Sequence, residues 1–131
     1  MLHALNGAHP IGTIEQVVDG AQLPALQQTI WGTHVEDRLR DYIIRLAGTT
    51  RSHADLALGA SPRATFALFR AAQAHAALHG REYVIPDDIK TLAPPVWRHR
   101  LLLRPESALR GRTAGSILDA VLADTLLEIE N

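Results

Sequence analysis

The segment from residue 61 to residue 80 does most to limit the folds open to this chain. Ser61 can cap a helix, Pro62 suits the first helical position, and Gly80 suits a left-handed helix end. Between them, small residues recur at helical spacing and form one nearly unbroken face: Ala64, Ala67, Leu68, Ala71, Ala74, His75 and Leu78. Because alanine is short, two neighbouring helices can approach this face closely, with Phe66 and Phe69 at its flanks. We therefore predict a helix from Ser61 to His79.

The composition agrees with a packed helical core. The 131 residues are 47% apolar, yet they include only two Phe, two Tyr and two Trp. The core must therefore be aliphatic and rich in alanine, the residue with the highest helix propensity. A domain of this size buries roughly two thirds of the surface that its unfolded chain exposes, so we expect a single domain with a real core.

Helical spacing and helix-start residues predict four further helices. They are a short helix from Asp19 to Gly32, an amphipathic helix from Glu36 that fades between Gly48 and Arg51, a helix from Pro86 that Pro94 and Pro95 interrupt, and a last helix from Thr113 with Leu126 on its apolar face. Residues 54–58 are predicted as a connecting turn and residues 101–104 as a short, buried extended segment. The prediction is an all-α fold, a bundle of four to five helices over residues 19–131, preceded by a linker or arm at residues 1–18.

Charge and hydropathy exclude several classes of protein. The formal net charge is −1, which gives no global field to attract nucleic acid or an anionic membrane, and no cysteine is present for disulfides or thiolate metal sites. No segment approaches the roughly 20 apolar residues of a membrane helix, and no signal peptide is recognisable. We expect a soluble, unexported, cytoplasmic protein that binds neither membrane nor nucleic acid.

Most candidate chemistry in the chain has an ordinary structural explanation. The single lysine, Lys90, lies within a predicted helix, so the chain has no P-loop of its own. His75 and His79 have the spacing of two metal ligands but lack an acid between them, which favours an ordinary helix surface and no metal. Asp87 and Asp88 fit compensation of a helix dipole better than acid catalysis. The basic cluster is expected to be a solvated rim: Arg98, Arg100, Arg104, Arg110 and Arg112.

Arg63 has no such simple explanation. It falls in the first turn of the helix that Ser61 begins, where free amides and the positive dipole end disfavour a cation by about 0.3 to 1 kcal/mol. An anion held nearby would offset that cost, as phosphates are at many helix N-termini. The alternatives are that Arg63 points into solvent or pairs with an upstream acid such as Asp55.

Two motifs of the chain are specific as a pair: Gly59–Ala64 (GASPRA), followed by Gly80–Val84 (GREYV). They stand in order with five further segments: Asp41–Ile44, Thr50–His53, Asp55–Leu58, Pro86–Lys90 and Val96–Leu101. In these motifs the chain resembles the C-terminal helical lid domain of the MoxR family of AAA+ ATPases, from about residue 10 to about residue 124. Magnesium-chelatase-type ATPase subunits have a related lid.

The resemblance implies that Arg63 is the sensor-2 arginine, which reaches the ATP phosphates held by a preceding core domain. Ser61 and Ala60 would lie beside the same phosphates, whereas a structural role at a helix end is favoured for Arg51. ATP and Mg²⁺ would be cofactors of a full-length parent, and this chain alone would bind neither and hydrolyse nothing.

Partners and wider function are likewise implied by the resemblance. They are the parent's own core, neighbouring subunits of a hexameric ring, and a von Willebrand factor A domain protein in chaperone-like maturation of other proteins. The alternative is a freestanding helical adaptor that binds protein or nucleic acid through its alanine-rich face or basic rim.

Overall fold

The computed structural model describes residue 12 and residues 14–127. Its elements in chain order are η3 (Gly20–Gln22, a 3-10 helix), α1 (Leu23–Trp31), α2 (Asp37–Ser52), β1 (Leu56–Leu58), α3 (Pro62–Leu78), α4 (Pro86–Trp97), η4 (Arg98–Arg100, a 3-10 helix), β2 (Leu102–Leu103), α5 (Pro105–Leu109) and α6 (Ala114–Asp124). The all-α fold is confirmed, and the short helix α5 adds to the four or five expected. The predicted arm at residues 1–18 lies largely outside the described residues.

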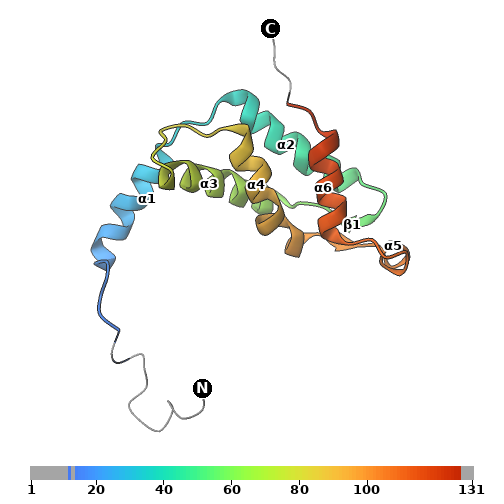
Figure 1. Cartoon of the computed structure of the whole chain (residues 1–131), viewed down its shortest axis with the longest axis horizontal. Coiled ribbons are helices and arrows are strands. Elements are labelled where there is room, and N and C mark those ends of the chain that lie inside the picture. The colour runs from blue at the N-terminus through green and yellow to red at the C-terminus, as the bar shows by residue number, and fades with distance from the viewer. Residues whose placement is uncertain (1–11, 13, 128–131) are drawn as a thin grey trace.

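The buried core lies between α2, α3, α4 and α6, whose arrangement Figure 1 shows. α3 packs most extensively against α4 and also contacts α2, while α6 packs against α2 and α4. The apolar stripe of the predicted amphipathic helix is buried in α2, as expected, and consists of Leu39, Tyr42, Ile43 and Leu46. α6 adds Ile117, Leu118 and Val121. Burial of each such aliphatic side chain contributes about 1.5 to 3 kcal/mol, which makes this core the main source of stability.

The predicted turn at residues 54–58 is wrong, because β1 lies there and pairs antiparallel with β2. The partners are Leu56 with Leu103 and Leu58 with Leu102, and an irregularity in the register separates the two pairs. The extended segment near residues 101–104 is confirmed, although it is only partly buried: Leu101 is buried, whereas Leu102 is exposed. This small sheet fixes the chain between α2 and α3 against the chain that follows α4.

The expected interruption by Pro94 and Pro95 is also wrong, since α4 continues through both residues to Trp97. The two prolines remove the N–H groups that would bond the carbonyls of Lys90 and Thr91. Lys90 and Thr91 are exposed, so water can satisfy those carbonyls. The continuous helix carries Trp97 into the core, where it is fully buried.

The buried face of α3 differs from the predicted one. Its buried residues are Ala64, Leu68, Ala72, Gln73 and Ala76, whereas Leu78 is 83% exposed. Ala67, Ala71 and Ala74 are only partly buried, and Phe66 stacks on Phe69 with its own ring largely exposed. Leu126 is likewise exposed, because α6 ends at Asp124. Small residues lie on most faces of α3, so the sequence pattern did not determine which face of the helix is buried.

α1 lies at one end of the bundle and has no buried residue (Figure 1). Gln73 connects α3 to the chain after α1, because its side-chain amide donates to the carbonyls of Trp31 (3.1 Å) and Thr33 (2.8 Å). A short parallel bridge then pairs His34 with Tyr83. None of the helices in the described part of the chain is long and apolar enough to cross a membrane.

Candidate functional site

The start of α3 is built as the sequence predicts. The Ser61 hydroxyl accepts a hydrogen bond from the amide of Ala64 at 3.2 Å, and Pro62 occupies the first turn. No acidic residue is present in that turn. Arg63 therefore extends from a capped helix N-terminus whose positive end its own sequence does not neutralise.

The Arg63 side chain is exposed, and within the described residues it makes no hydrogen bond or ion pair. Pairing with Asp55 is not observed, because that carboxylate accepts from the Ser107 hydroxyl at 2.7 Å and lies 3.6 Å from Arg112. The Ser107 hydrogen bond, with smaller help from nearby cations, lowers the pKa of Asp55. Asp55 thus has partners of its own, and the guanidinium of Arg63 is free to meet a ligand from outside the chain.

Upstream of Arg63, the chain is attached to the end of α2. The amide of Ala60 donates to the Thr50 hydroxyl at 2.9 Å, and that hydroxyl donates to the carbonyl of Ala47 at 2.7 Å. Thr50, Ala47 and Ala60 are all completely buried. Beside them, a Cβ on Gly59 would lie 2.4 Å from the backbone nitrogen of Arg51, so only glycine fits there.

Downstream of Arg63, α4 fixes the same turn. The indole N–H of the buried Trp97 donates to the carbonyl of Ala64 at 2.9 Å. Because Trp97 is the last residue of α4, the C-terminal end of α4 lies against the first turn of α3. The backbone that bears Arg63 is therefore fixed on both sides, while its side chain is not.

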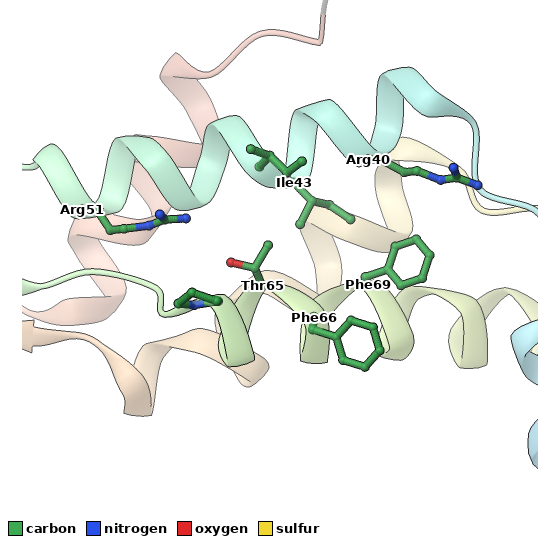
Figure 2. Close-up of a pocket in the computed structure, with 8 residues that line it drawn as sticks. Arg40, Ile43, Arg51, Thr65, Phe66 and Phe69 are labelled. Atoms are coloured by element: carbon green, nitrogen blue, oxygen red, sulfur yellow. The ribbon is translucent and has the colours of Figure 1, made fainter.

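A groove between α2 and α3 adjoins this turn (Figure 2). Its volume is about 350 Å³, and its lining is mostly apolar: Ile43, Ile44, Pro62, Thr65, Phe66 and Phe69, with Arg40 and Arg51 from α2. Ile44 and Phe66 are each 58% exposed. The guanidinium of Arg70 lies over the rings of Trp31, Phe66 and Phe69, 4.7 to 5.6 Å from their centroids. Arg51 lies in the last turn of α2 and also lines the groove.

At the far end of α3, Asp88 is the centre of a buried charged cluster. Arg81 binds it with two hydrogen bonds of 2.7 Å, His75 Nδ1 lies 2.7 Å away, and the Ile85 amide donates at 2.9 Å. Burial alone would raise the pKa of this carboxyl, but the hydrogen bonds outweigh it and bring the pKa to about 2. Asp88 therefore does more than compensate a helix dipole: it joins α3, the Gly80–Val84 segment and α4.

The remaining candidate residues, the histidine pair and the basic cluster, do not come together in one site of the described structure. The rings of His75 and His79 lie 4.3 Å apart, but His75 faces Asp88, so it is not an ordinary surface residue as predicted. The described part of the chain holds no group of three or more metal-ligating side chains. The five arginines of the basic cluster are all exposed, and Arg112 faces Asp55.

The comparison with protein families bears directly on this geometry. The model of the family described as "AAA lid domain" matches residues 48–121, more than half of the chain, including Thr50, Gly59, Arg63 and Trp97. The chain belongs to the AAA lid domain family. The lid is of the kind found in MoxR-family AAA+ ATPases, as three relatives and one solved structure support.

The lid is 38% identical over 123 residues to the uncharacterized protein YeaC of Bacillus subtilis, a match covering 94% of the lid and 38% of the relative. It is 37% identical to the chaperone MoxR1 of Mycobacterium tuberculosis, over 68% of the lid and 26% of that protein. For protein MoxR of Paracoccus denitrificans the identity is 35%, over 70% and 31%. The lid thus spans between 26% and 38% of the length of these relatives.

A solved structure shares the fold of the lid. It belongs to a candidate ATPase from Cytophaga hutchinsonii and superimposes with a TM-score of 0.82 at 28% sequence identity. The match covers 88% of the lid and 38% of that chain. The likeness extends the family assignment from sequence to three-dimensional structure.

Sequence reasoning found Arg63 and its cap but missed the residues of the lid that fix them. In the sequence, Thr50 and Trp97 stand out only as members of the matching segments Thr50–His53 and Val96–Leu101. The one available signal was Gly59, a glycine two residues before the helix cap Ser61, since glycine in such a turn often marks a close approach of two backbone segments. The partner in that approach could not be read from the sequence, because it lies on another helix.

Proposed function

We propose that this lid closes over the nucleotide of a MoxR-type AAA+ ATPase and that Arg63 acts there as the sensor-2 arginine. The observation that carries the proposal is the free guanidinium of Arg63 on a backbone fixed by Thr50 and Trp97. A preorganised cation of this kind stabilises negative charge on a phosphoryl group during transfer. Ser61 and Ala60 would lie beside the same phosphates.

The residues present fit ATP as a ligand shared with another domain. A guanidinium without a carboxylate partner matches the geometry and charge of a phosphate. ATP would supply the phosphoryl group, while this chain supplies one cation and the capped turn that holds it. The described residues offer no ligand cluster for Mg²⁺, so the parent's core domain would have to hold that ion.

The proposal extends to assembly and physiological role. The lid matches only 26% to 38% of the length of these relatives, which leaves room in them for a nucleotide-binding core. We infer that the lid packs on that core and on neighbouring subunits of a hexameric ring. The Mycobacterium tuberculosis relative is named a chaperone, which supports a role in the maturation of partner proteins, with a von Willebrand factor A domain protein as one candidate.

Replacing Arg63 by alanine in the full-length parent tests the proposal. We expect Arg63→Ala to lower ATP turnover by about 10² to 10³-fold, because a preorganised charge that acts in the transition state is lost. The melting temperature should not fall, since the side chain makes no hydrogen bond or ion pair within the described lid. Steady-state ATP hydrolysis and thermal unfolding measure the two quantities.

Arg38→Ala is the matched control. Arg38 is an exposed arginine on α2 that pairs with Glu36, so its loss should leave turnover unchanged. Equal turnover for wild type and Arg63→Ala, with both folded, would refute the sensor-2 role. Equal losses in both variants would mean that a general effect of surface charge had been mistaken for a specific one.

A further inference from the structure

We infer that Thr50 is a positioning residue for Arg63 and that it acts through the amide of Ala60. The inference rests on the proposed function, because it assigns to α2 a role in positioning Arg63 for that function. Its physical basis is the pair of hydrogen bonds made by one buried hydroxyl, at 2.7 Å to the Ala47 carbonyl and at 2.9 Å from the Ala60 amide.

The hydroxyl of Thr50 is held in one orientation. Its proton is directed to the carbonyl of Ala47 within the same helix, which leaves its lone pairs to accept from Ala60. All three residues have no exposed surface, so water cannot replace either bond. The position of Ala60 relative to α2 is thus set by a single side-chain atom.

Close backbone contact makes this link short and stiff. Gly59 packs so tightly on the end of α2 that the site of its missing Cβ lies 2.5 Å from the carbonyl carbon of Thr50. The loop therefore cannot slide along the helix without losing the hydrogen bond to Ala60. The end of α2 and the start of α3 move as one piece.

Little freedom remains between Ala60 and Arg63. Ser61, the residue after Ala60, is fixed at the start of α3 because its hydroxyl accepts a hydrogen bond from the amide of Ala64. The ring of Pro62 restricts φ of Pro62 itself, the residue before Arg63. Any displacement of Ala60 therefore passes to the Cα of Arg63. Misplacement of a catalytic group by about 1 Å can cost on the order of 100-fold in rate, so the effect should be visible in turnover.

The chain supplies a matched set of variants in the full-length parent. Thr50→Val keeps the shape but removes the acceptor of Ala60, while Thr50→Ser keeps the hydroxyl. Thr49→Val is the control, because Thr49 also bonds a carbonyl within α2, that of Arg45 at 3.0 Å, and no bond from its hydroxyl to the α3 loop is found in the described residues.

For Thr50→Val we expect kcat to fall by about tenfold or more while the KM for ATP changes less than about threefold. Thr50→Ser should stay within about threefold of wild type, and Thr49→Val should match wild type. A purely structural role would instead lower activity in proportion to the fraction unfolded, which thermal unfolding of the same samples measures.

Amide hydrogen exchange of the 131-residue chain tests the link without any catalysis. Exchange at Ala60 should accelerate at least about tenfold in Thr50→Val and remain slow in Thr50→Ser and Thr49→Val. If Arg63→Ala lowers turnover but Thr50→Val does not, the inference is wrong and the proposed function stands. If Arg63→Ala has no effect, the proposed function fails and the inference fails with it, even where Ala60 exchange shows the link itself.

Discussion

At the scale of single residues, two charged side chains of the lid lie in opposite environments. Asp88 is 2% exposed, and its carboxylate is hydrogen-bonded to Arg81, His75 and the Ile85 amide. Arg63 is exposed on a rigid backbone with no protein partner in the described structure. Asp88 is therefore a structural charge, whereas Arg63 is available to a ligand from outside the chain, as the proposed function requires.

The lowered pKa of Asp88 makes a prediction about pH. The charged form is favoured in the folded state, so its contribution is complete above the ordinary pKa of 3.8 and is lost as pH falls through the folded pKa of about 2. A shift of this size corresponds to about 2 kcal/mol. Urea unfolding should show Asp88→Asn less stable than wild type at pH 7, with the gap narrowing steadily between pH 4 and pH 2.

Asp87→Asn provides the control, because Asp87 is exposed at the same helix start. It should change stability by less than about 1 kcal/mol, the range of a dipole interaction at the surface. A gap between Asp88→Asn and wild type that does not depend on pH would contradict the account of this cluster.

The sequence singled out Arg63 as unusual but did not single out Asp88. Arg63 was conspicuous because it breaks a local rule of helix starts, and local rules can be read from neighbouring residues. Asp88 obeys the same rule as Asp87, so nothing local separates them. What distinguishes Asp88 is its contact with His75 and Arg81, which depends on how α3 packs against α4.

At the scale of elements, the site depends on the close approach of the α3 loop to α2. Gly59→Ala would place a methyl group 2.4 Å from the backbone nitrogen of Arg51, and two backbones would have to separate. We expect a loss of about 1 to 3 kcal/mol, as for overpacking in a core. Gly48→Ala should instead stabilise the lid by about 0.5 to 1 kcal/mol, since no atom lies within 4 Å and the helix gains propensity.

Chemical denaturation of both glycine variants measures these opposite signs. A Gly59→Ala lid as stable as wild type would show that the loop can move away from α2 at little cost. In that case the fixed position of Arg63 would lose its structural basis.

The main helices were predictable, whereas the pairing of β1 with β2 was not, for a physical reason. Ser61, Thr113 and the stripe of α2 are local signals, and all three were confirmed. β1 and β2 comprise five residues in total, and the strand that pairs with each of them lies more than 40 residues away in the sequence. The continuity of α4 through Pro94 and Pro95 could not be predicted either. It depends on the exposure to water of the two carbonyls that lose their hydrogen bonds, which is set by the packing of the whole helix.

At the scale of the whole molecule, the contacts that fix the first turn of α3 come from separate elements of the lid. The end of α2 holds that turn through Thr50, the end of α4 holds it through Trp97, and the α2–α3 groove opens beside it (Figure 2). Three parts of the bundle thus meet where Arg63 leaves the surface. This arrangement suits a rigid body that presents one charge to a site completed by another domain.

The most direct test is the structure of the full-length parent bound to a non-hydrolysable ATP analogue. The account predicts the Arg63 guanidinium at about 2.7 to 2.9 Å from an oxygen of the β- or γ-phosphate, with the bonds from Thr50 to Ala60 and from Trp97 to Ala64 intact. A nucleotide bound in every subunit with Arg63 directed into solvent, or paired with a carboxylate of the core, would contradict it.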